Sequence, residues 1–159
     1  MGLTMKVSGM EELTAQLSQM GEKALGIASR GLYEGAGTMS EEINKEANAI
    51  KTAPFHYAVF IQREPSPEEK AVVLAGGAGI AKFNKNGAEV NTSVGYARAG
   101  YADLLGKKVP IPKIANAINS GTSFMKKQPF FRRAVASGTG KATAAITKKI
   151  EEAIDEITK

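Results

Sequence analysis

Residues 24–50 repeat apolar side chains at a helical spacing, and this repeat constrains the fold more than any other feature of the sequence. The apolar positions follow one another at intervals of three or four: Ala24, Ala28, Leu32, Ala36, Met39, Ile43, Ala47 and Ile50. Such intervals place the side chains on one face of an α-helix. The sequence therefore predicts a long amphipathic helix, which should end before Pro54 because proline cannot continue a helix and restricts the residue before it.

Four glycines fall inside or beside this stripe: Gly26, Gly31, Gly35 and Gly37. Each destabilises a helix interior by up to about 1 kcal/mol relative to alanine. The helix must therefore be stabilised by tertiary packing or by a neighbouring subunit. Two interpretations are open: the glycines are simply tolerated, or they let another backbone approach closely. We favour tolerance.

A second amphipathic helix is predicted at the end of the chain. Its apolar face carries Ala142, Ala145, Ile146, Ile150, Ala153, Ile154 and Ile157, and its opposite face carries Lys148, Lys149, Glu151, Glu152 and Glu156. Upstream, Pro129 is placed to start a helix that buries Phe130 or Phe131 with Ala134 and Val135. We expect the Gly-Thr-Gly sequence at residues 138–140 to interrupt this region.

Capping and turn residues mark shorter elements. The sequence predicts a capping box at residues 8–11 before a first helical stripe, a helix from Pro67 to about Leu74 that Ser66 caps, and a helix over residues 113–119. Residues 79–83 and 90–96 are predicted to form a hairpin around the Asn-Gly turn at residues 84–87, with Val90, Thr92 and Val94 on one face.

These elements predict an α+β fold in which a long N-terminal helix and a C-terminal helix pack on a small antiparallel sheet with extended loops. At 159 residues the chain is expected to be one domain, residues 1–159. Residues 97–112 carry glycines, prolines and Lys107-Lys108, and this pattern predicts a long, exposed, positively charged loop. Residues 120–123 are expected to form a turn.

Composition excludes several classes of protein. Hydrophobic residues make up 43% and charged residues 23% of the chain, which is typical of a folded globular domain. The longest apolar run is far below the roughly 18 residues that span a bilayer, and the N-terminus lacks the apolar region of a secretory signal, so we expect the chain to stay in the cytosol where it is made. There is no cysteine, and His56 is the sole histidine, so a metal site is not expected.

The catalytic patterns are equally sparse. No serine has the spacing of a nucleophile elbow, although a triad with His56 and Asp103 or Asp155 can be assembled on paper. Residues 138–143 resemble a phosphate loop but lack its first glycine and its Ser or Thr. Adjacent carboxylates such as Glu41-Glu42 and Glu68-Glu69 point in different directions on a helix, and we interpret them as surface charges.

Basic and aromatic residues alternate in one stretch: Phe124, Lys126, Lys127, Phe130, Phe131, Arg132 and Arg133. This mixture can stack on nucleic-acid bases. Because Phe130 and Phe131 lie on a predicted helix, we favour core packing for the aromatic side chains, with the basic ones outside. The net charge of +5 is spread along the chain and favours polyanions only modestly.

Residues 116–134 read Asn-Ala-Ile-Asn-Ser-Gly-Thr-Ser-Phe-Met-Lys-Lys-Gln-Pro-Phe-Phe-Arg-Arg-Ala. This stretch resembles the signature of the gene-product-ten-like tail-component family of the lambda-like phage HK ninety-seven, in which Gly-Thr-Ser is followed by Pro-Phe and basic residues before a C-terminal helix. The Gly-Met-Glu-Glu-Leu start at residues 9–13 and the middle segments 79–83, 90–91 and 95–96 also look like members of the family. Residues 52–75 and Asn119 differ from its usual pattern.

The resemblance implies a structural virion protein without catalytic activity or cofactor, located at the head-tail junction and in the host cytoplasm during assembly. It implies a homo-oligomeric ring, often a hexamer, that contacts the head-completion (stopper) protein, the tail terminator or the tail tube, while genomic DNA passes through its lumen. No membrane partner is expected. Because loops on a rigid scaffold carry recognition, we expect subunit or ring contacts at Lys107, Lys108, Ser120, Gly121, Thr122, Ser123, Phe124, Lys126, Lys127 and Arg132.

Two alternatives stay open. A non-specific DNA-binding module would lose affinity steeply with salt and would gather its basic residues on one face. A small hydrolase would depend on His56.

Overall fold

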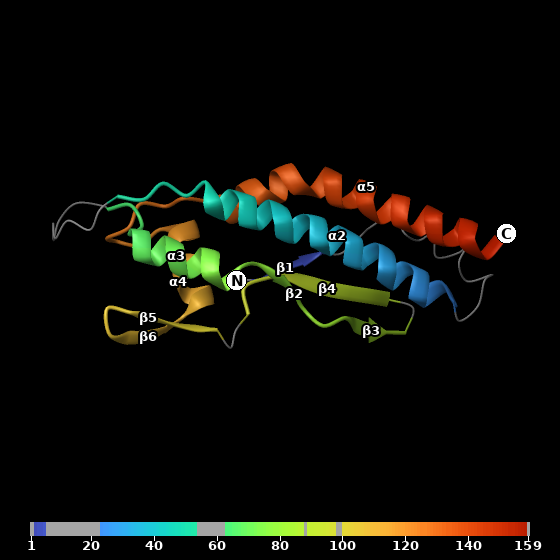
Figure 1. Cartoon of the computed structure of the whole chain (residues 1–159), viewed down its shortest axis with the longest axis horizontal. Helices are drawn as coiled ribbons and strands as arrows, with labels where there is room; N and C mark the ends of the chain where they lie inside the picture. The colour runs from blue at the N-terminus through green and yellow to red at the C-terminus, as the bar shows by residue number, and fades with distance from the viewer. Residues whose placement is uncertain (1, 6–22, 54–62, 88, 98–99, 159) are drawn as a thin grey trace.

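Two long antiparallel helices form the spine of the molecule. The computed structural model describes residues 2–5, 23–53, 63–87, 89–97 and 100–158. Helix α2 (Lys23–Asn48) and helix α5 (Phe130–Thr158) lie side by side along the long axis, with the strands beneath α2 and the C-terminus at one end (Figure 1). The predicted α+β class, with two long helices on small antiparallel sheets, is confirmed. Helix α2 ends at Asn48 and so before Pro54, as predicted, while Pro54 itself and the predicted helical stripe before residue 21 lie outside the described residues.

Two glycines of α2 allow the helices to approach closely. A Cβ on Gly31 would lie 2.6 Å from Cγ1 of Ile150 and 3.2 Å from the backbone oxygen of Ile146. A Cβ on Gly35 would overlap the side chain of Ile146. Gly26 and Gly37, by contrast, face open space. Simple tolerance is therefore the wrong interpretation for Gly31 and Gly35, because the backbone of α5 occupies the space beside them.

Helix α5 is continuous, so the predicted interruption at residues 138–140 is wrong. Gly138 is buried against α2, where a Cβ would lie 3.1 Å from the sulfur of Met39, and Gly140 faces open space. Packing along α2 offsets the low helix propensity of the two glycines. The segment that resembled a phosphate loop thus lies in the middle of a helix, where its amides bond within the helix.

A small antiparallel sheet is built around strand β4 (Glu89–Gly95). Strands β1 (Gly2–Met5) and β2 (Gly79–Ile80) pair with one end of β4, and β3 (Asn84–Asn86) pairs with the other. The predicted hairpin is confirmed in outline, but its turn lies at Gly87, with φ 61°, and residues 84–86 form a strand rather than the turn. Thr92 and Val94 are buried beneath α2, as the alternation predicted.

The expected long loop at residues 97–112 is wrong. Strands β5 (Tyr101–Leu104) and β6 (Lys107–Pro110) form a hairpin whose turn holds Leu105 at φ 53° and Gly106 at φ 77°. The Asp103 carboxylate accepts a hydrogen bond from the Gly106 amide at 2.9 Å and stabilises this turn. Helix α4 (Ile111–Ser120) then begins two residues before the predicted start at 113, because proline is accepted in the first turn of a helix.

Helix α3 (Pro67–Gly76) starts as its sequence predicted. The Ser66 hydroxyl accepts the Glu69 amide, and the Glu69 carboxylate accepts the Ser66 amide, so the two residues form a capping box. Gly77, with φ 55°, follows its last turn. The predicted helix and its Ser66 cap are confirmed.

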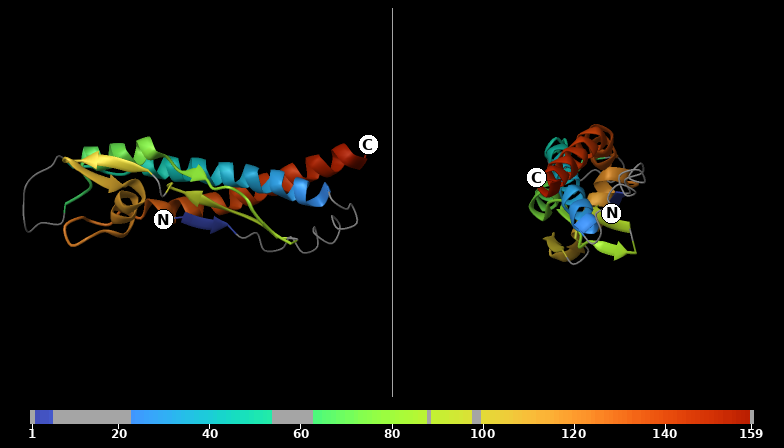
Figure 2. Two further views of the ribbon diagram at one scale, coloured as in Figure 1. Left: turned by 90° about the horizontal axis from the view of Figure 1, so that it is seen from below. Right: turned by 90° about the vertical axis from the view of Figure 1, so that its right-hand side faces the viewer.

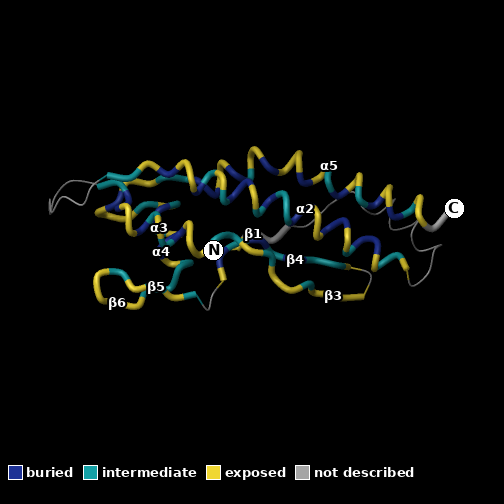
Figure 3. Tube along the Cα trace, viewed as in Figure 1, coloured by how far each residue is buried: buried dark blue, intermediate teal, exposed yellow. Residues whose placement is uncertain are grey.

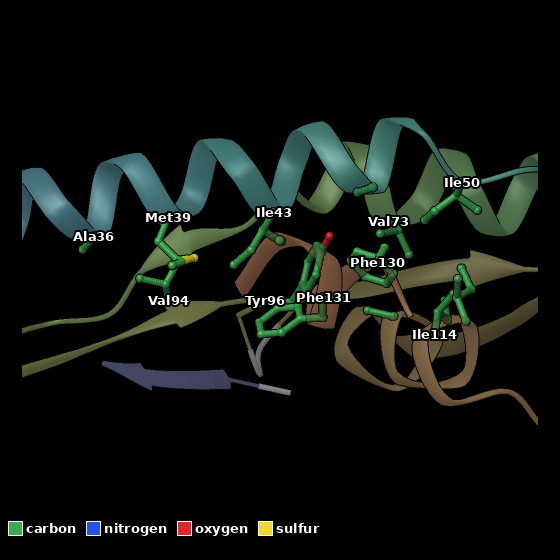
Figure 4. Close-up of a cluster of buried hydrophobic side chains, with 14 of the residues drawn as sticks. Ala36, Met39, Ile43, Ile50, Val73, Val94, Tyr96, Ile114, Phe130 and Phe131 are labelled. Atoms are coloured by element: carbon green, nitrogen blue, oxygen red, sulfur yellow. The ribbon is translucent and has the colours of Figure 1, made fainter. Parts of the chain in front are cut away.

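The main hydrophobic core lies where α2, α3, α4, β4 and the start of α5 meet. Figure 4 shows Tyr96, Phe130 and Phe131 gathered beneath Ile43 of α2. Phe130 packs edge-on against both Tyr96 and Phe131. Buried positions follow the facing sides of α2 and α5, and exposed ones follow their outer sides (Figure 3). Core packing of Phe130 and Phe131 is therefore confirmed.

No helix within the described part of the chain is long and apolar enough to cross a membrane.

Candidate functional site

The segment between α4 and α5, residues 121–129, is a tightly bonded loop that exposes one aromatic side chain. Thr122 and Met125 exchange backbone hydrogen bonds, and the Thr122 hydroxyl accepts the amides of Phe124 and Met125 at 3.2 and 3.0 Å. Gly121, at φ 76°, turns the chain out of α4. Met125 is buried in the core and anchors the loop, whereas Phe124 is 63% exposed.

The backbone of Arg63 is hydrogen-bonded to this loop. Its amide donates to the Phe124 carbonyl at 2.8 Å, and its carbonyl accepts the Lys126 amide at 2.6 Å, which forms a parallel β-bridge centred on Met125. The Arg63 guanidinium in turn makes two hydrogen bonds to the Glu69 carboxylate, at 2.6 and 2.7 Å. Glu69 is in turn fixed in the capping box of α3. The exposed loop is therefore connected to α3 through Arg63 and Glu69.

The charge state of Glu69 follows from these contacts. Burial tends to raise the pKa of this carboxyl, but hydrogen bonds from the Arg63 guanidinium and the Ser66 amide outweigh burial and hold the pKa below its ordinary value. The same interaction raises the pKa of Arg63. The pair is therefore ionised at neutral pH. Interpreting Glu69 as a surface charge was wrong, because only 9% of its side chain is exposed.

Gln128 closes the other side of the loop. Its side-chain oxygen accepts the Lys51 amide at 2.9 Å, and its side-chain nitrogen donates to the Lys51 carbonyl at 2.7 Å. The Gln128 amide donates to the Ile118 carbonyl, and Asn119 accepts the Phe131 amide at the start of α5. The loop is thus bonded at both ends to the chain beyond α2 and to α4.

A basic cleft of about 400 Å³ lies between the end of α2, the bonded loop and the start of α5. It is lined by Glu46, Ala49, Lys51, Glu64, Lys126, Lys127, Gln128, Pro129 and Arg133. Arg133 donates from Nε to the Glu46 carboxylate at 2.7 Å. Lys51, Lys126 and Lys127 form no salt bridge with any described residue. The cleft therefore carries an excess of positive charge.

The hairpin of β5 and β6 supplies a second basic tip. Its turn residue Leu105 is 80% exposed, and Lys107 and Lys108 are exposed beside it. The hairpin turn and the bonded loop both reach the end of the molecule opposite the C-terminus of α5 (Figures 1 and 2). Each of these two segments thus presents a large apolar side chain followed by two lysines.

Nine of the ten predicted contact residues lie in or beside these two segments, and the tenth, Arg132, lies on α5. Lys107 and Lys108 lie on β6, Arg132 is exposed in the first turn of α5, and the others lie in or beside the bonded loop: Ser120, Gly121, Thr122, Ser123, Phe124, Lys126 and Lys127. The cleft includes Lys126 and Lys127 from this set. Gly121 and Thr122 shape the loop, and its exposed side chains include Ser123, Phe124 and the two lysines. Core packing was therefore the wrong expectation for Phe124.

Sequence reasoning missed the carboxylate at Glu42. Its side chain accepts hydrogen bonds from Lys141 at 2.5 Å and from Ser137 at 3.1 Å, across the seam between α2 and α5. The Lys141 hydrogen bond is the largest cause that lowers the pKa of Glu42, and the Ser137 hydroxyl adds to it. Interpreting Glu42 as a surface charge was wrong. Its position one turn after Met39, on the apolar stripe, was the signal that could have identified it.

The described residues give little support to the hydrolase alternative. His56 lies outside the described residues, and the Asp103 carboxylate accepts a hydrogen bond within the hairpin turn. No group of three or more His, Cys, Asp or Glu side chains that could hold a metal ion occurs in the described part of the chain. No protein-family model, curated protein or solved structure matches this chain.

Proposed function

We propose that this chain is a structural, non-enzymatic virion protein of the head-tail junction of a tailed phage, where it helps to join the tail to the capsid. The observation that carries the proposal is the bonded loop. Residues 116–134, which resemble the tail-component signature, form a hydrogen-bonded segment that buries Met125 and Phe130 and exposes Phe124 with Lys126 and Lys127. A loop built this way is suited to contact another protein.

The hydrogen bonds of the loop lower the entropic cost of binding a partner. A flexible loop loses conformational entropy when it docks, whereas a loop already fixed by hydrogen bonds loses much less. Exposed aromatic side chains on such rigid supports are the residues that dominate protein interfaces. Phe124 meets both conditions, because its own carbonyl and the amide of Lys126 are hydrogen-bonded to the backbone of Arg63. In the proposed assembly, the partners are other copies in a ring, the stopper, and the terminator or tube protein.

A second candidate function is non-specific DNA binding. It is supported by Phe124, Lys126, Lys127 and Arg132, which are exposed, and whose basic members form no salt bridge with a described residue. Against it, Phe130 and Phe131 are buried and cannot stack on bases. In the proposed junction, a modest positive charge suits a channel through which DNA passes without tight binding.

Electron microscopy of particles tests the proposal. Particles assembled with a tagged copy of the chain should show the label at the junction between head and tail. Lysates that lack the chain should contain filled heads and separate tails, and the wild-type chain supplied in trans should restore joined particles. Label elsewhere on the particle, or normal joining without the chain, would contradict the proposal.

A further inference from the structure

We propose that the basic cleft at the end of α2 binds an acidic peptide segment of a partner protein. The inference rests on the proposed function, in which the chain acts through protein contacts. It specifies that one partner carries an acidic segment. The cleft lies beside the exposed loop, so a segment seated in it would lie next to Phe124.

The charge of the cleft selects an anionic ligand. Lys51, Lys126 and Lys127 line it without a salt bridge to any described residue, and Arg133 uses only its Nε in the pair with Glu46. Unpaired cations around a concave surface attract carboxylates and strengthen hydrogen bonds to them.

The two carboxylates in the lining distinguish a peptide from a nucleic acid. Glu46 and Glu64 both border the cleft. A phosphate backbone carries a negative charge at every nucleotide and would be repelled by them. An acidic peptide, in contrast, places its carboxylates on the lysines and can donate its backbone N–H groups to Glu46 and Glu64. The mixed lining therefore fits a peptide better.

The size and rigidity of the cleft fit the same ligand. A volume of about 400 Å³ accommodates a few residues of an extended chain but not a duplex. The backbone of its walls is held in place, because Gln128 is hydrogen-bonded to both backbone groups of Lys51 and the Arg63 carbonyl accepts the Lys126 amide. A preformed cleft loses little entropy when a ligand binds.

Fluorescence anisotropy with the full chain tests this inference. The probe is a fluorescein-labelled octapeptide of alternating Glu and Gly, compared with the same peptide carrying Gln and with labelled oligothymidine of equal length. We expect the Glu peptide to bind and the Gln peptide to bind at least about tenfold more weakly, because the lysines recognise charge.

Two matched double variants separate the cleft from overall charge. Lys126→Glu with Lys127→Glu should weaken binding of the Glu peptide by about tenfold or more, because two attractive contacts become repulsive. Lys107→Glu with Lys108→Glu makes the same change of charge on the hairpin and should alter binding less than about twofold, because those residues do not line the cleft. Thermal unfolding of each variant checks that it is folded.

Three results would overturn the inference: equal weakening by both double variants, equal binding of the Glu and Gln peptides, or tighter binding of oligothymidine that only the Lys126 and Lys127 variant abolishes. The last result would assign the cleft to nucleic acid. These measurements use the isolated chain, so they can fail while electron microscopy still places the chain at the junction, and the reverse can also occur.

Discussion

Gly35 of α2 lies so close to Ile146 of α5 that a Cβ at this position would overlap the isoleucine side chain and would come within 3.1 Å of the Ala142 carbonyl oxygen. Gly37, two residues further along the same helix, has nothing within 4 Å of the corresponding point. The two glycines therefore have opposite roles, and substituting each by alanine separates them.

Gly35→Ala should destabilise the protein by about 1–3 kcal/mol, because the added methyl group forces apart two packed helices. Gly37→Ala should stabilise it by about 0.5–1 kcal/mol, because alanine favours the helix and meets no neighbour. Urea unfolding of both variants measures the two free energies. A stabilising Gly35→Ala would show that the helices do not pack in this register.

Local patterns predicted the parts of the fold that depend on local interactions. The stripe that includes Ile43 and Ala47 predicted α2, and Ser66 with Pro67 predicted the start of α3, because helical periodicity and capping involve residues within a few positions of one another. The same reasoning predicted that Phe130 is buried.

Contacts between distant parts of the chain could not be predicted in this way. Glu42 finds its partner Lys141 at a separation of 99 residues, and the two glycines at 31 and 35 acquire their role only when α5 lies beside them. The β5–β6 hairpin was missed because its turn uses Leu105 at positive φ, a conformation that few residues other than glycine adopt. The turn at residues 120–123 was predicted, but the cleft depends on Gln128 and Lys51, which are 77 residues apart.

Tyr96 carries a buried hydroxyl to which no described residue offers a hydrogen bond. Burial also raises its pKa to about 12, so the side chain is neutral at ordinary pH. Tyr96→Phe keeps the ring packed against Phe130 and removes the unpaired polar group. We expect the variant to be more stable by about 1 kcal/mol, because an unsatisfied hydroxyl is costly in a core. Thermal and urea unfolding check this, and a clear loss of stability would indicate that the hydroxyl has a partner.

Glu69 should make stability depend on acid pH. Its pKa lies below the ordinary value of 4.5, so its ionised form stabilises the folded state above about pH 4.5, and this contribution is lost as the pH falls through the lowered pKa. At pH 7, Glu69→Gln should lower the free energy of unfolding by about 1–3 kcal/mol, less than for a fully buried pair. The reason for the smaller effect is that the Arg63 side chain is 30% exposed.

The difference between wild type and Glu69→Gln should shrink steadily below pH 4.5, because the protonated carboxyl and the amide are then both neutral partners for Arg63. Urea unfolding of both proteins from pH 7 to pH 3 measures this difference in the free energy of unfolding. Glu68→Gln serves as the control, since Glu68 is exposed on the same helix turn and should leave the profile close to that of the wild type. A difference that stays constant across this range would show that the charge of Glu69 does not stabilise the fold.

Phe124 and Tyr101 are each 63% exposed, which makes them a matched pair for testing the loop in assembly. Neither Phe124→Ala nor Tyr101→Ala should change the free energy of unfolding by more than about 0.5 kcal/mol, because surface substitutions remove little packing.

We expect Phe124→Ala to reduce the yield of joined particles by at least about tenfold, since a rigid exposed aromatic residue at an interface contributes about 2 kcal/mol or more. Tyr101→Ala should leave that yield within about twofold of the wild type, because Tyr101 lies at the base of the hairpin, where it pairs with Pro110, and is not part of the bonded loop. Complementation of particles that lack the chain, counted by electron microscopy, provides the comparison. Equal yields for the two variants would mean that joining does not depend on Phe124.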